Sequence, residues 1–460
     1  MRLTANQPYR VESDLLGEIQ VPEHALYGAQ TARAIENFPV GRQRTIGSFY
    51  PLIRALLLIK KAAAMTNREI GALKPELSDA IVKAADHLLE NPQPEQFPIH
   101  ILHGGGGTSA NMNANEVLAN LGEELLGGRR GRRERLDPND HVNLHQSTND
   151  VYPTACHMAI LFQWPGLRIA LDMLQQALIS SAEEFRPQVR LARTCLQDAV
   201  DISFGDYLGG MAAQIGRLAA QLEETVKRLH SVALGGTICG RREDVPDAYM
   251  NRVNSVLAAV TGDPLFEPAA DLFDAAQNPD EMIAVSAKLD ILARSLIKIA
   301  KDFRLLSSGP EGGLKELRLP AVQPGSSIMP GKINPVIPEF IVQIGFRVMG
   351  NNTMAAAGLD HGELDLNVWE SSMVFPVLES MELLESGIRQ FTDRCISGME
   401  PSVNVNNGNA RTIIPELTRL ARQYGYQRVT KVCKQAHDDI GLLRNLLSQN
   451  FGDDAGTKDR

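Results

Sequence analysis

Apolar residues recur at alternating spacings of four and three along several long stretches of the chain. Between residues 283 and 308 an apolar seam follows this spacing, and charged residues lie off it. The seam consists of Val285, Leu289, Leu292, Leu296, Ile299, Phe303 and Leu306. Residues three and four apart lie on the same face of an α-helix. The pattern therefore predicts an amphipathic helix over 283–308.

Two further stretches, 207–234 and 371–396, carry the same period. Pro376 predicts a kink near the start of the second. Three helices of this length predict a bundle, and we expect subunits to associate where one chain leaves apolar faces uncovered. No alternating pattern of comparable strength predicts a large sheet, so short strands are expected only near 24–29 and 231–238.

Composition narrows the class of protein. The chain has 460 residues, enough for two or three domains, and a formal net charge of −9. Proteins that bind nucleic acid or acidic membranes are normally basic. The five cysteines include no C-x-x-C pair, which argues against a disulfide framework or structural zinc. No signal core and no apolar run of roughly 20 residues is present. We expect a cytoplasmic protein without a nucleic-acid or membrane partner.

Three segments concentrate small polar residues and glycine. In the first, residues 103–116 (HGGGGTSANMNANE), four glycines leave backbone N–H groups unobstructed. Thr108 follows at a predicted helix start, where such donors favour anions. A flexible hinge is the alternative. A nucleotide P-loop would need a lysine that the segment lacks, and a hydrolase oxyanion loop would need a G-x-S-x-G elbow that the chain lacks.

The second segment, residues 139–150 (NDHVNLHQSTND), carries three consecutive hydrogen-bonding side chains at 147–149. A helix cap or turn is the alternative interpretation. His141 and His145 have the i, i+4 spacing of helical metal ligands, but the expected partner glutamate and a Cys/His cluster are missing. We therefore expect no metal site.

The third segment, residues 325–335 (GSSIMPGKINP), ends a long loop rich in glycine and proline that begins at 309. Two serines lie between Gly325 and Gly331, and a lysine and an asparagine follow. Loops of this length inside a domain are usually functional or disordered. A plain linker would not need these side chains, although the residues alone leave that alternative open.

The string GSSIMPGKINP closely resembles the signature loop of the aspartase/fumarase superfamily. Other blocks resemble the family in the expected order, and the resemblance covers most of residues 11–400. The blocks are DLLGEIQVPEHALYGAQTARAIENF (14–38), GGTSANMNANEVLAN (106–120), HVNLHQSTNDVYPTA (141–155), RTCLQDA (193–199), DFRLLSSGPEGGL (302–314) and GELDLNV (362–368). Within the superfamily, GGGGTSANMN, RLLSSGP and INPVIPE look more like the aspartase form.

The resemblance implies a mainly all-α, three-domain fold of the aspartase/fumarase type. Its domains would be an N-terminal helical domain (1–146), a central long-helix bundle (147–397) and a small C-terminal helical domain (398–460). It further implies a homotetramer whose bundles join into a 20-helix core, with each active site shared by three subunits. No cofactor and no metal are implied, and the substrate would be a small dicarboxylate or amino acid.

The implied reaction is a reversible anti elimination from a succinyl compound with release of fumarate, and deamination of L-aspartate is the form we favour. Removing the weakly acidic proton creates an aci-carboxylate, so catalysis needs a positioned base and donors for the extra charge. By similarity, Ser326 is the base, acting as an alkoxide. Backbone N–H groups of its loop would have to stabilise that alkoxide, and the loop would close over the substrate.

The remaining roles that the resemblance assigns are those of holding the substrate. The carboxylate that gains charge would be bound by Thr108, Ser147, Thr148 and Ser327. The other carboxylate would be bound by Lys332, which we count with Ser326 as catalytic, and by Asn334. The amino group would contact Asn149 and Thr194.

Two positions depart from the family pattern. Cys195 stands where relatives often have histidine, or glutamine in aspartases, and the histidine pairs with a glutamate that corresponds to Glu339. Cysteine cannot form that charged pair, which disfavours fumarase-like water chemistry; a neutral substitution is the alternative. Residues 235–246 (GGTICGRREDVP) carry four charges where relatives usually read G-T-G-x-N. If this loop faces the site, the substrate is larger or more acidic than aspartate; a solvated turn is the interpretation we favour.

Three other functions remain open. They are a lyase for an N-substituted aspartate or another succinyl compound, a fumarate hydratase, and a catalytically silent paralogue. The joint presence of the hydroxyl, lysine and amide residues above disfavours the silent paralogue.

Overall fold

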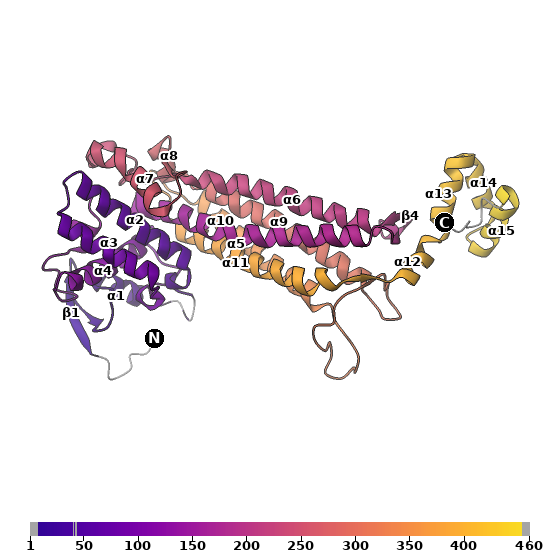
Figure 1. Ribbon diagram of the computed structural model, residues 1–460, viewed down its shortest axis with the longest axis horizontal. Coiled ribbons are helices and arrows are strands. Elements are labelled where there is room, and N and C mark those ends of the chain that lie inside the picture. Colours follow the sequence, from indigo (N-terminus) through magenta and orange to yellow (C-terminus); the bar gives the residue numbers. More distant parts are fainter. Residues whose placement is uncertain (1–7, 40, 42–43, 453–460) are drawn as a thin grey trace. The chain divides into compact units, whose positions relative to one another are not determined.

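The computed structural model describes residues 8–39, 41 and 44–452, and these form a mainly α-helical protein (Figure 1). Sheets among the described residues are all two-stranded. None of the described helices is long and apolar enough to cross a membrane. The mainly helical architecture is the one that the apolar periodicity predicted.

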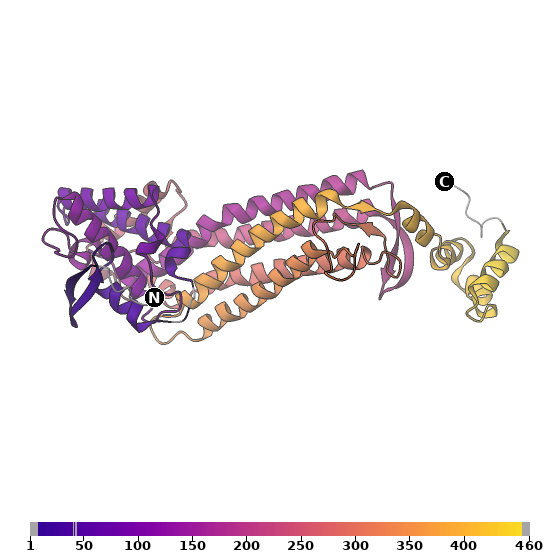
Figure 2. The ribbon, with the colours of Figure 1, turned by 90° about the horizontal axis from the view of Figure 1, so that it is seen from below.

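Five long helices contribute to both of the compact units into which the chain divides. They are α5 (Thr148–Glu184), α6 (Phe204–Lys227), α9 (Asp280–Leu306), α10 (Val336–Asp360) and α11 (Glu370–Arg394). Within each unit their segments run side by side (Figures 1 and 2). The helices predicted over 207–234, 283–308 and 371–396 are thereby confirmed as α6, α9 and α11.

The apolar seam that predicted α9 lies in the protein interior. Every residue of that seam, from Val285 to Leu306, is buried. Helix α6 ends earlier than predicted, because a 3-10 turn, η4 (Arg228–His230), leads into the short strand β5 (Ser231–Val232). The strand expected near 231–238 is therefore confirmed in part.

Helices α5 and α10 were not predicted, and for α5 the structure gives a physical reason. Residues 158–160 of α5 are consecutive and fully buried, so its apolar positions do not form a one-sided stripe. The strand expected near 24–29 is wrong. This segment turns from β2 into α1, and the backbone N–H of Leu26 donates to the Oε1 of Gln96 rather than to a strand.

The first unit comprises Met1–Arg168, Ala220–Ala293 and Phe346–Leu384. Its shorter helices are α1 (Ala29–Asn37), α2 (Tyr50–Glu69), α3 (Pro75–Glu90), α4 (Thr108–Leu125), α7 (Asp247–Thr261) and α8 (Leu272–Gln277). Helix α2 packs against α3, α4 and α7. Its strands are the antiparallel pair β1 (Tyr9–Asp14) and β2 (Gly17–Pro22), and the parallel pair β5 and β6 (Glu267–Pro268).

The second unit comprises Ile169–Ala219, Arg294–Gly345 and Glu385–Arg460. Its strands are the antiparallel pairs β3 (Val189–Thr194) with β4 (Gln197–Ser203), and β7 (Leu317–Arg318) with β8 (Glu400–Pro401). Its shorter helices are α12 (Val403–Ala410), α13 (Ile413–Tyr424), α14 (Tyr426–Gln435) and α15 (Ile440–Phe451). The last three enclose a small apolar core of their own. The three-domain boundaries implied by the resemblance stay a prediction.

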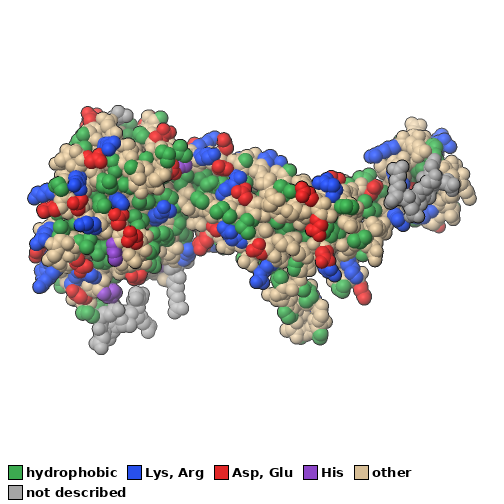
Figure 3. Space-filling view, viewed as in Figure 1, with side chains coloured by type: hydrophobic (Ala, Val, Ile, Leu, Met, Phe, Trp, Pro, Cys, Tyr) green, Lys and Arg blue, Asp and Glu red, His purple; other side chains and the backbone are tan. Residues whose placement is uncertain are grey.

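Charged side chains of both signs are interspersed over the face drawn in Figure 3. The formal net charge of −9 is therefore not gathered into one acidic patch on that face. Mixed signs of this kind keep the long-range field of the surface weak.

A buried carboxylate, that of Glu316, ties together several parts of the second unit. It is fully buried and lies 2.6 Å from the Nη2 of Arg193 and 3.5 Å from the Nη2 of Arg190. The Nδ2 of Asn409 donates to the same carboxylate at 2.9 Å. The carboxylate thus joins β3 to the start of the long 309–335 loop and to α12. Removing one partner of a buried ion pair is costly because it leaves the other charges uncompensated.

We expect Glu316→Gln to lower the free energy of unfolding by about 3–5 kcal/mol, because two arginines then lose their buried counter-ion. Urea unfolding followed by circular dichroism measures the change. The matched control is Glu400→Gln, since Glu400 pairs with Arg318 at the surface and its loss should cost less than about 1 kcal/mol. Equal effects of the two substitutions would contradict the structural role of Glu316.

Candidate active site

The glycine-rich segment forms a tight turn that begins helix α4. Gly105, Gly106 and Gly107 have φ of 86°, 56° and 80°, a region that only glycine adopts readily. No described side chain caps the helix start that follows. The N–H of Thr108 donates to the carbonyl oxygen of Gly105 at 3.0 Å, which leaves the next N–H groups of the first turn, those of Ser109 and Ala110, as donors toward an anion. Thr108, the first helical residue, is exposed beside them.

Gly107 also allows α4 and α5 to approach closely. A Cβ at this position would lie 2.2 Å from the Cδ1 of Tyr152. Tyr152 is fully buried, and its hydroxyl forms a 2.8 Å hydrogen bond with the Oγ of Ser371. The absent side chain at 107 therefore brings Thr108 against the first turns of α5.

The second polar segment forms the start of α5 and is joined to α4 by a hydrogen bond. The Oγ of Ser147 accepts the N–H of Asn149 at 3.2 Å, so the cap interpretation is correct at this position. The Oγ1 of Thr148 accepts from the Nδ2 of Asn111, which lies one turn after Thr108, at 3.0 Å. Two helix starts and their hydroxyl groups thus lie together in the first unit.

Beneath this segment lies a lysine with no exposed surface, Lys60 of α2. Its Nζ donates to the Oδ1 of Asn143 and the Oε1 of Gln146, both at 2.9 Å. The same Oδ1 of Asn143 accepts from the side chains of Asn111 and Asn115. Burial lowers the pKa of Lys60 to about 7. The lysine therefore holds the chain just before Ser147 in place.

The buried carboxylate of Asp150 ties the 235–246 loop to the same helix start. It accepts the N–H groups of Ser147 at 2.9 Å, Gly235 at 3.0 Å and Thr237 at 3.2 Å. Burial raises the pKa of Asp150 to about 6. The beginning of the 235–246 loop is therefore part of the candidate site.

The middle of the 235–246 loop contacts the candidate site, whereas its charged residues face solvent. The Nδ2 of Asn149 donates to the carbonyl oxygen of Ile238 at 2.6 Å. In contrast, the side chains of Arg241 and Glu243 are 55% and 75% exposed and lie 3.7 Å apart. The side chain of Arg242 lies outside the described residues. The loop thus combines a backbone contact to the site with charges that face solvent.

In the second unit, the 309–335 loop holds its serine in a turn of backbone donors. The Oγ of Ser326 accepts the N–H groups of Ile328 at 3.3 Å and Met329 at 3.0 Å. These are donors of the kind that a serine alkoxide would need. Gly331 has φ of 83°, so the second glycine of the motif supplies a left-handed turn.

The same loop closes on itself behind Ser326. The N–H of Gly325 donates to the carbonyl of Lys332 at 2.8 Å, and the Nδ2 of Asn334 donates to the carbonyl of Gly325 at 2.9 Å. A Cβ at Gly325 would lie 2.7 Å from the backbone nitrogen of Asn334. Ser327 and Lys332 are exposed. The motif therefore presents its lysine to solvent while its asparagine braces the turn.

Thr194 and Cys195 lie at the tip of the β3–β4 hairpin, and both are exposed. Cys195 and Leu196 have φ of 53° and 62°, as in a two-residue type I′ turn. Glu339 lies in the first turn of α10, where its carboxylate is 3.4 Å from the Nη2 of Arg304. Glu339 thus has a cationic partner within the second unit.

The predicted site residues therefore fall into groups. Those of the first unit that lie together are Thr108, Ser147, Thr148 and Asn149. Those that share one loop of the second unit are Ser326, Ser327, Lys332 and Asn334. The hairpin carries Thr194 and Cys195. That all of these contribute to one active site stays a prediction.

The two histidines considered as metal ligands do not lie on successive turns of one helix. His141 lies in the π-turn η3 (Pro138–Val142), where its Nδ1 accepts the N–H of Asp137 at 2.8 Å. His145 has φ of 61°, and its Nδ1 lies 2.7 Å from the Oδ1 of Asn67. Within the described part of the chain, no group of His, Cys, Asp and Glu side chains is arranged to hold a metal ion.

Sequence reasoning missed the residues that support the site. Lys60 stands in the apolar run LLLIKKAAA, so a charge among buried positions was the available signal. Asp150 directly follows the three polar residues that were singled out. Its role depends on residues 85 and 87 positions away in the sequence, and no local pattern indicates these.

Comparison with known proteins relates the whole chain to one group of enzymes. A model of the lyase family matches residues 17–350. An aspartate ammonia-lyase from a Bacillus species is 39% identical over 442 residues, which cover 96% of this chain and 93% of that protein. A class II fumarate hydratase from Myxococcus xanthus is 40% identical over 440 residues, which cover 95% and 93%.

A solved structure agrees with these sequence relatives. The fumarate lyase:delta crystallin from Brucella melitensis, bound to cobalt, matches this chain with a TM-score of 0.92 and 39% identity, covering 96% of each chain. The relatives carry the names of two different activities. The comparisons therefore support a family and a fold, but do not distinguish between the two substrates.

A pH effect on stability should arise from Lys60. Because burial lowers its pKa to about 7, the folded protein binds fewer protons at this side chain than the unfolded chain between about pH 7 and the ordinary value of 10.5. The contribution of Lys60 to the free energy of unfolding therefore rises over this interval. We expect Lys60→Met to remove this rise, measured as the difference in Tm between wild type and variant from pH 7 to pH 10.

The matched control is Lys61→Met, because Lys61 neighbours Lys60 in the sequence but pairs with Asp86 near the surface. This variant also loses one lysine and should keep the rise in stability with pH. A Tm difference between wild type and Lys60→Met that stays constant with pH would show that the buried ammonium does not titrate in this range.

Proposed function

This chain belongs to the aspartase/fumarase superfamily of lyases, and within it we propose that the protein catalyses the reversible anti elimination of ammonia from L-aspartate to give fumarate. The observation that carries the proposal is the pair of N–H groups, from Ile328 and Met329, that donate to the Oγ of Ser326. A serine hydroxyl in water is such a weak acid that almost none of it is ionised at neutral pH, and only the ionised form, the alkoxide, is a strong enough base for this step. Preorganised donors at its oxygen favour the ionised form.

In the proposed reaction, the alkoxide of Ser326 takes a proton from the carbon next to the amine-bearing carbon. The electron pair of the broken C–H bond moves into the neighbouring carboxylate, which becomes an aci-carboxylate. That pair then returns to form the carbon–carbon double bond as the carbon–nitrogen bond breaks, and the substrate's protonated amino group takes the pair of that bond and leaves as neutral ammonia. The base and the leaving group lie on opposite faces, which makes the elimination anti.

The first unit supplies donors suited to the charge that develops in this reaction. The uncapped start of α4 and the hydroxyl groups of Thr108, Ser147 and Thr148 lie together, and we assign them to the carboxylate that becomes aci. Donors fixed before the reaction stabilise developing charge without having to reorganise. Lys60 and Asp150 act through these groups and are positioning residues.

The second unit supplies the base and the groups for the other carboxylate. The exposed ammonium of Lys332 follows Ser326 in the same loop, and we assign it with Asn334 to that carboxylate. Ser327 joins the first group, and Thr194 joins Asn149 at the amine. Because these residues belong to separate parts of the chain, we propose a homotetramer in which three subunits share each site, in the cytoplasm.

Two features favour an amine over water as the leaving group. Relatives with a histidine at the position of Cys195 pair it with a glutamate at the position of Glu339. Here the carboxylate of Glu339 lies beside Arg304, so the side chain has a different charged partner. The strings GGGGTSANMN, RLLSSGP and INPVIPE also resemble the aspartase form more closely.

One contact favours a second candidate, a lyase for an N-substituted aspartate. The side chain of Asn149, which we assign to the amino group, contacts the carbonyl of Ile238 in the 235–246 loop. A substituent on the substrate nitrogen would therefore extend toward this loop. The side chain of Ile238 is 58% exposed and would offer such a substituent an apolar contact.

We expect Ser326→Ala to lower kcat for L-aspartate by about 10²- to 10⁴-fold, the usual contribution of a general base. Release of fumarate, followed by its absorbance, measures the change. Ser448→Ala is the matched control, because Ser448 is exposed on α15 and makes the same substitution away from the site. A Ser326→Ala enzyme that is folded and near wild type in turnover would remove Ser326 from the base role.

Substrate choice can be tested in the direction of addition. Fumarate is mixed with ammonia or with a panel of larger amines, malate is tested alone, and the fumarate absorbance is followed. We expect ammonia-dependent loss of fumarate. Loss only with a larger amine would favour the N-substituted substrate, malate turnover would favour a fumarate hydratase, and inactivity throughout would favour a silent paralogue.

A further inference from the structure

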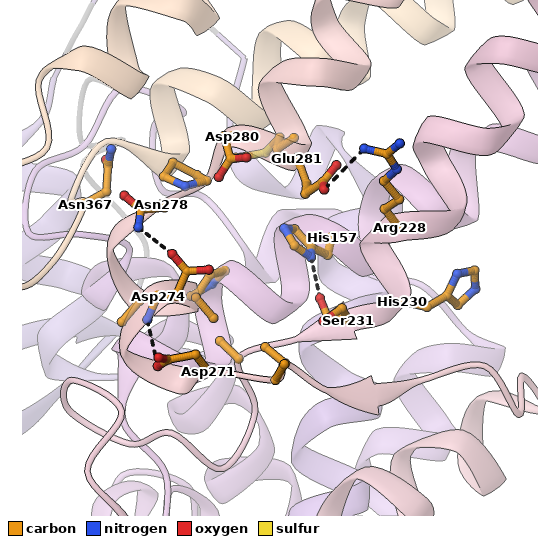
Figure 4. A pocket seen from close by; sticks show the side chains of 18 of the residues that line it. His157, Arg228, His230, Ser231, Asp271, Asp274, Asn278, Asp280, Glu281 and Asn367 are labelled. Carbon is orange, nitrogen blue, oxygen red and sulfur yellow. Dashed lines mark hydrogen bonds and ion pairs between the residues drawn. The ribbon is translucent and has the colours of Figure 1, made fainter.

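The first unit contains a cavity of about 480 Å³ whose lining includes none of the residues assigned to the candidate active site. Its walls come from the first turns of α5, from η4 and β5, from the β6–α8 segment, and from the starts of α9 and α11 (Figure 4). The lining mixes charged side chains with alanines, two prolines and Met282. A cavity of this volume is large enough for a small organic ligand.

Carboxyl groups outnumber cations in this lining. The carboxyl groups are those of Glu267, Asp271, Asp274, Asp280, Glu281 and Glu370, and the cations are Lys227 and Arg228. Both cations are already paired, since Lys227 lies 3.2 Å from the carboxylate of Glu223 and Arg228 lies 3.6 Å from that of Glu281. The uncompensated charge of the wall is therefore negative.

Several of the remaining polar groups have partners within the protein. Asp271 caps α8 by accepting two N–H groups, and Asp274 accepts from the Nδ2 of Asn278 at 2.7 Å. The Nδ1 of His157 lies 3.2 Å from the carbonyl of Ser231, and burial lowers the pKa of this imidazole. These contacts leave the carboxyl groups of Glu267, Asp280 and Glu370 without a described partner. Glu267 lies on the exposed strand β6, so we assign the ligand to Asp280 and to the buried Glu370.

Among the carboxyl groups of the cavity wall, that of Glu370 is unusual because it is buried and has an oxygen atom without a described partner. The residue is only 4% exposed, and its Oε2 is buried with no hydrogen-bond partner among the described residues. An unpaired buried polar atom carries a desolvation cost that a partner would relieve. Burial also raises the pKa of Glu370 to about 8, so its carboxyl group is mostly neutral at pH 7.

We propose that this cavity binds an aliphatic amine, held as its ammonium form by Glu370 and Asp280 with its carbon chain along the alanine and proline walls. The negative wall selects a cation, and the apolar surfaces suit methylene groups. A metal ion is a poor occupant, because no group of His, Cys, Asp and Glu in the described part of the chain is arranged to coordinate one.

Binding of an amine in this cavity should be accompanied by release of a proton. An ammonium beside Glu370 favours the ionised carboxylate, so binding drives the carboxyl proton into solvent. Amine binding near pH 7 should therefore release up to one proton per ligand. Ordinary surface attraction of a cation by fixed carboxylates would release none.

The test is isothermal titration calorimetry with 1,4-diaminobutane at pH 7 in two buffers of different ionisation enthalpy. We expect saturable binding with one site per chain and a heat that depends on the buffer. Glu370→Gln should weaken binding about tenfold, the effect of losing one charge-assisted contact, and should abolish the buffer dependence. Asp280→Asn should weaken binding about as much and keep the proton release.

The matched control is Glu76→Gln, which removes an exposed carboxylate at the start of α3 in the same unit and should change neither quantity. Thermal melts of each variant verify folding. Absence of saturable binding by the wild type would overturn the proposal. So would unchanged affinity and proton release in Glu370→Gln, or equal saturable binding of Mg²⁺.

Discussion

The candidate site of the first unit depends on one buried ammonium group, that of Lys60. A lysine without exposed surface is tolerable only where its hydrogen bonds are satisfied, and here two amide oxygens accept from it. Those amides belong to the chain just before the start of α5, and one of them also accepts from α4. The position of several hydroxyl groups therefore depends on a small buried network of polar contacts around Lys60.

Three of the long helices could be predicted from the local periodicity of apolar residues. The seam of α9 and the positions of α6 and α11 follow from residues three and four apart. Helix α5 was not predicted, because its first half is buried on several sides and its apolar residues therefore do not form a stripe along one face. The three polar segments were identifiable because glycine and hydroxyl residues cluster in them, and the donors around Ser326 lie within three residues of it.

What the sequence could not predict consists of contacts between distant segments. Lys60 meets Asn143 across 83 positions, and Asp150 meets Gly235 across 85. Such pairs depend on how helices pack, which local patterns do not encode. Substrate choice is hidden as well, because relatives of almost equal identity to this chain carry the names of different activities.

Glu316 anchors the 309–335 loop near its beginning. Its carbonyl oxygen accepts hydrogen bonds from Ser402 and Asn406, and its carboxylate is paired with arginines. The other end of the loop is fixed where α10 begins at Val336. A segment that is held at both ends can change its conformation between them without displacing the helices to which it is attached. If this loop closes over a substrate, the conformational entropy that is lost comes only from the residues between the two anchors.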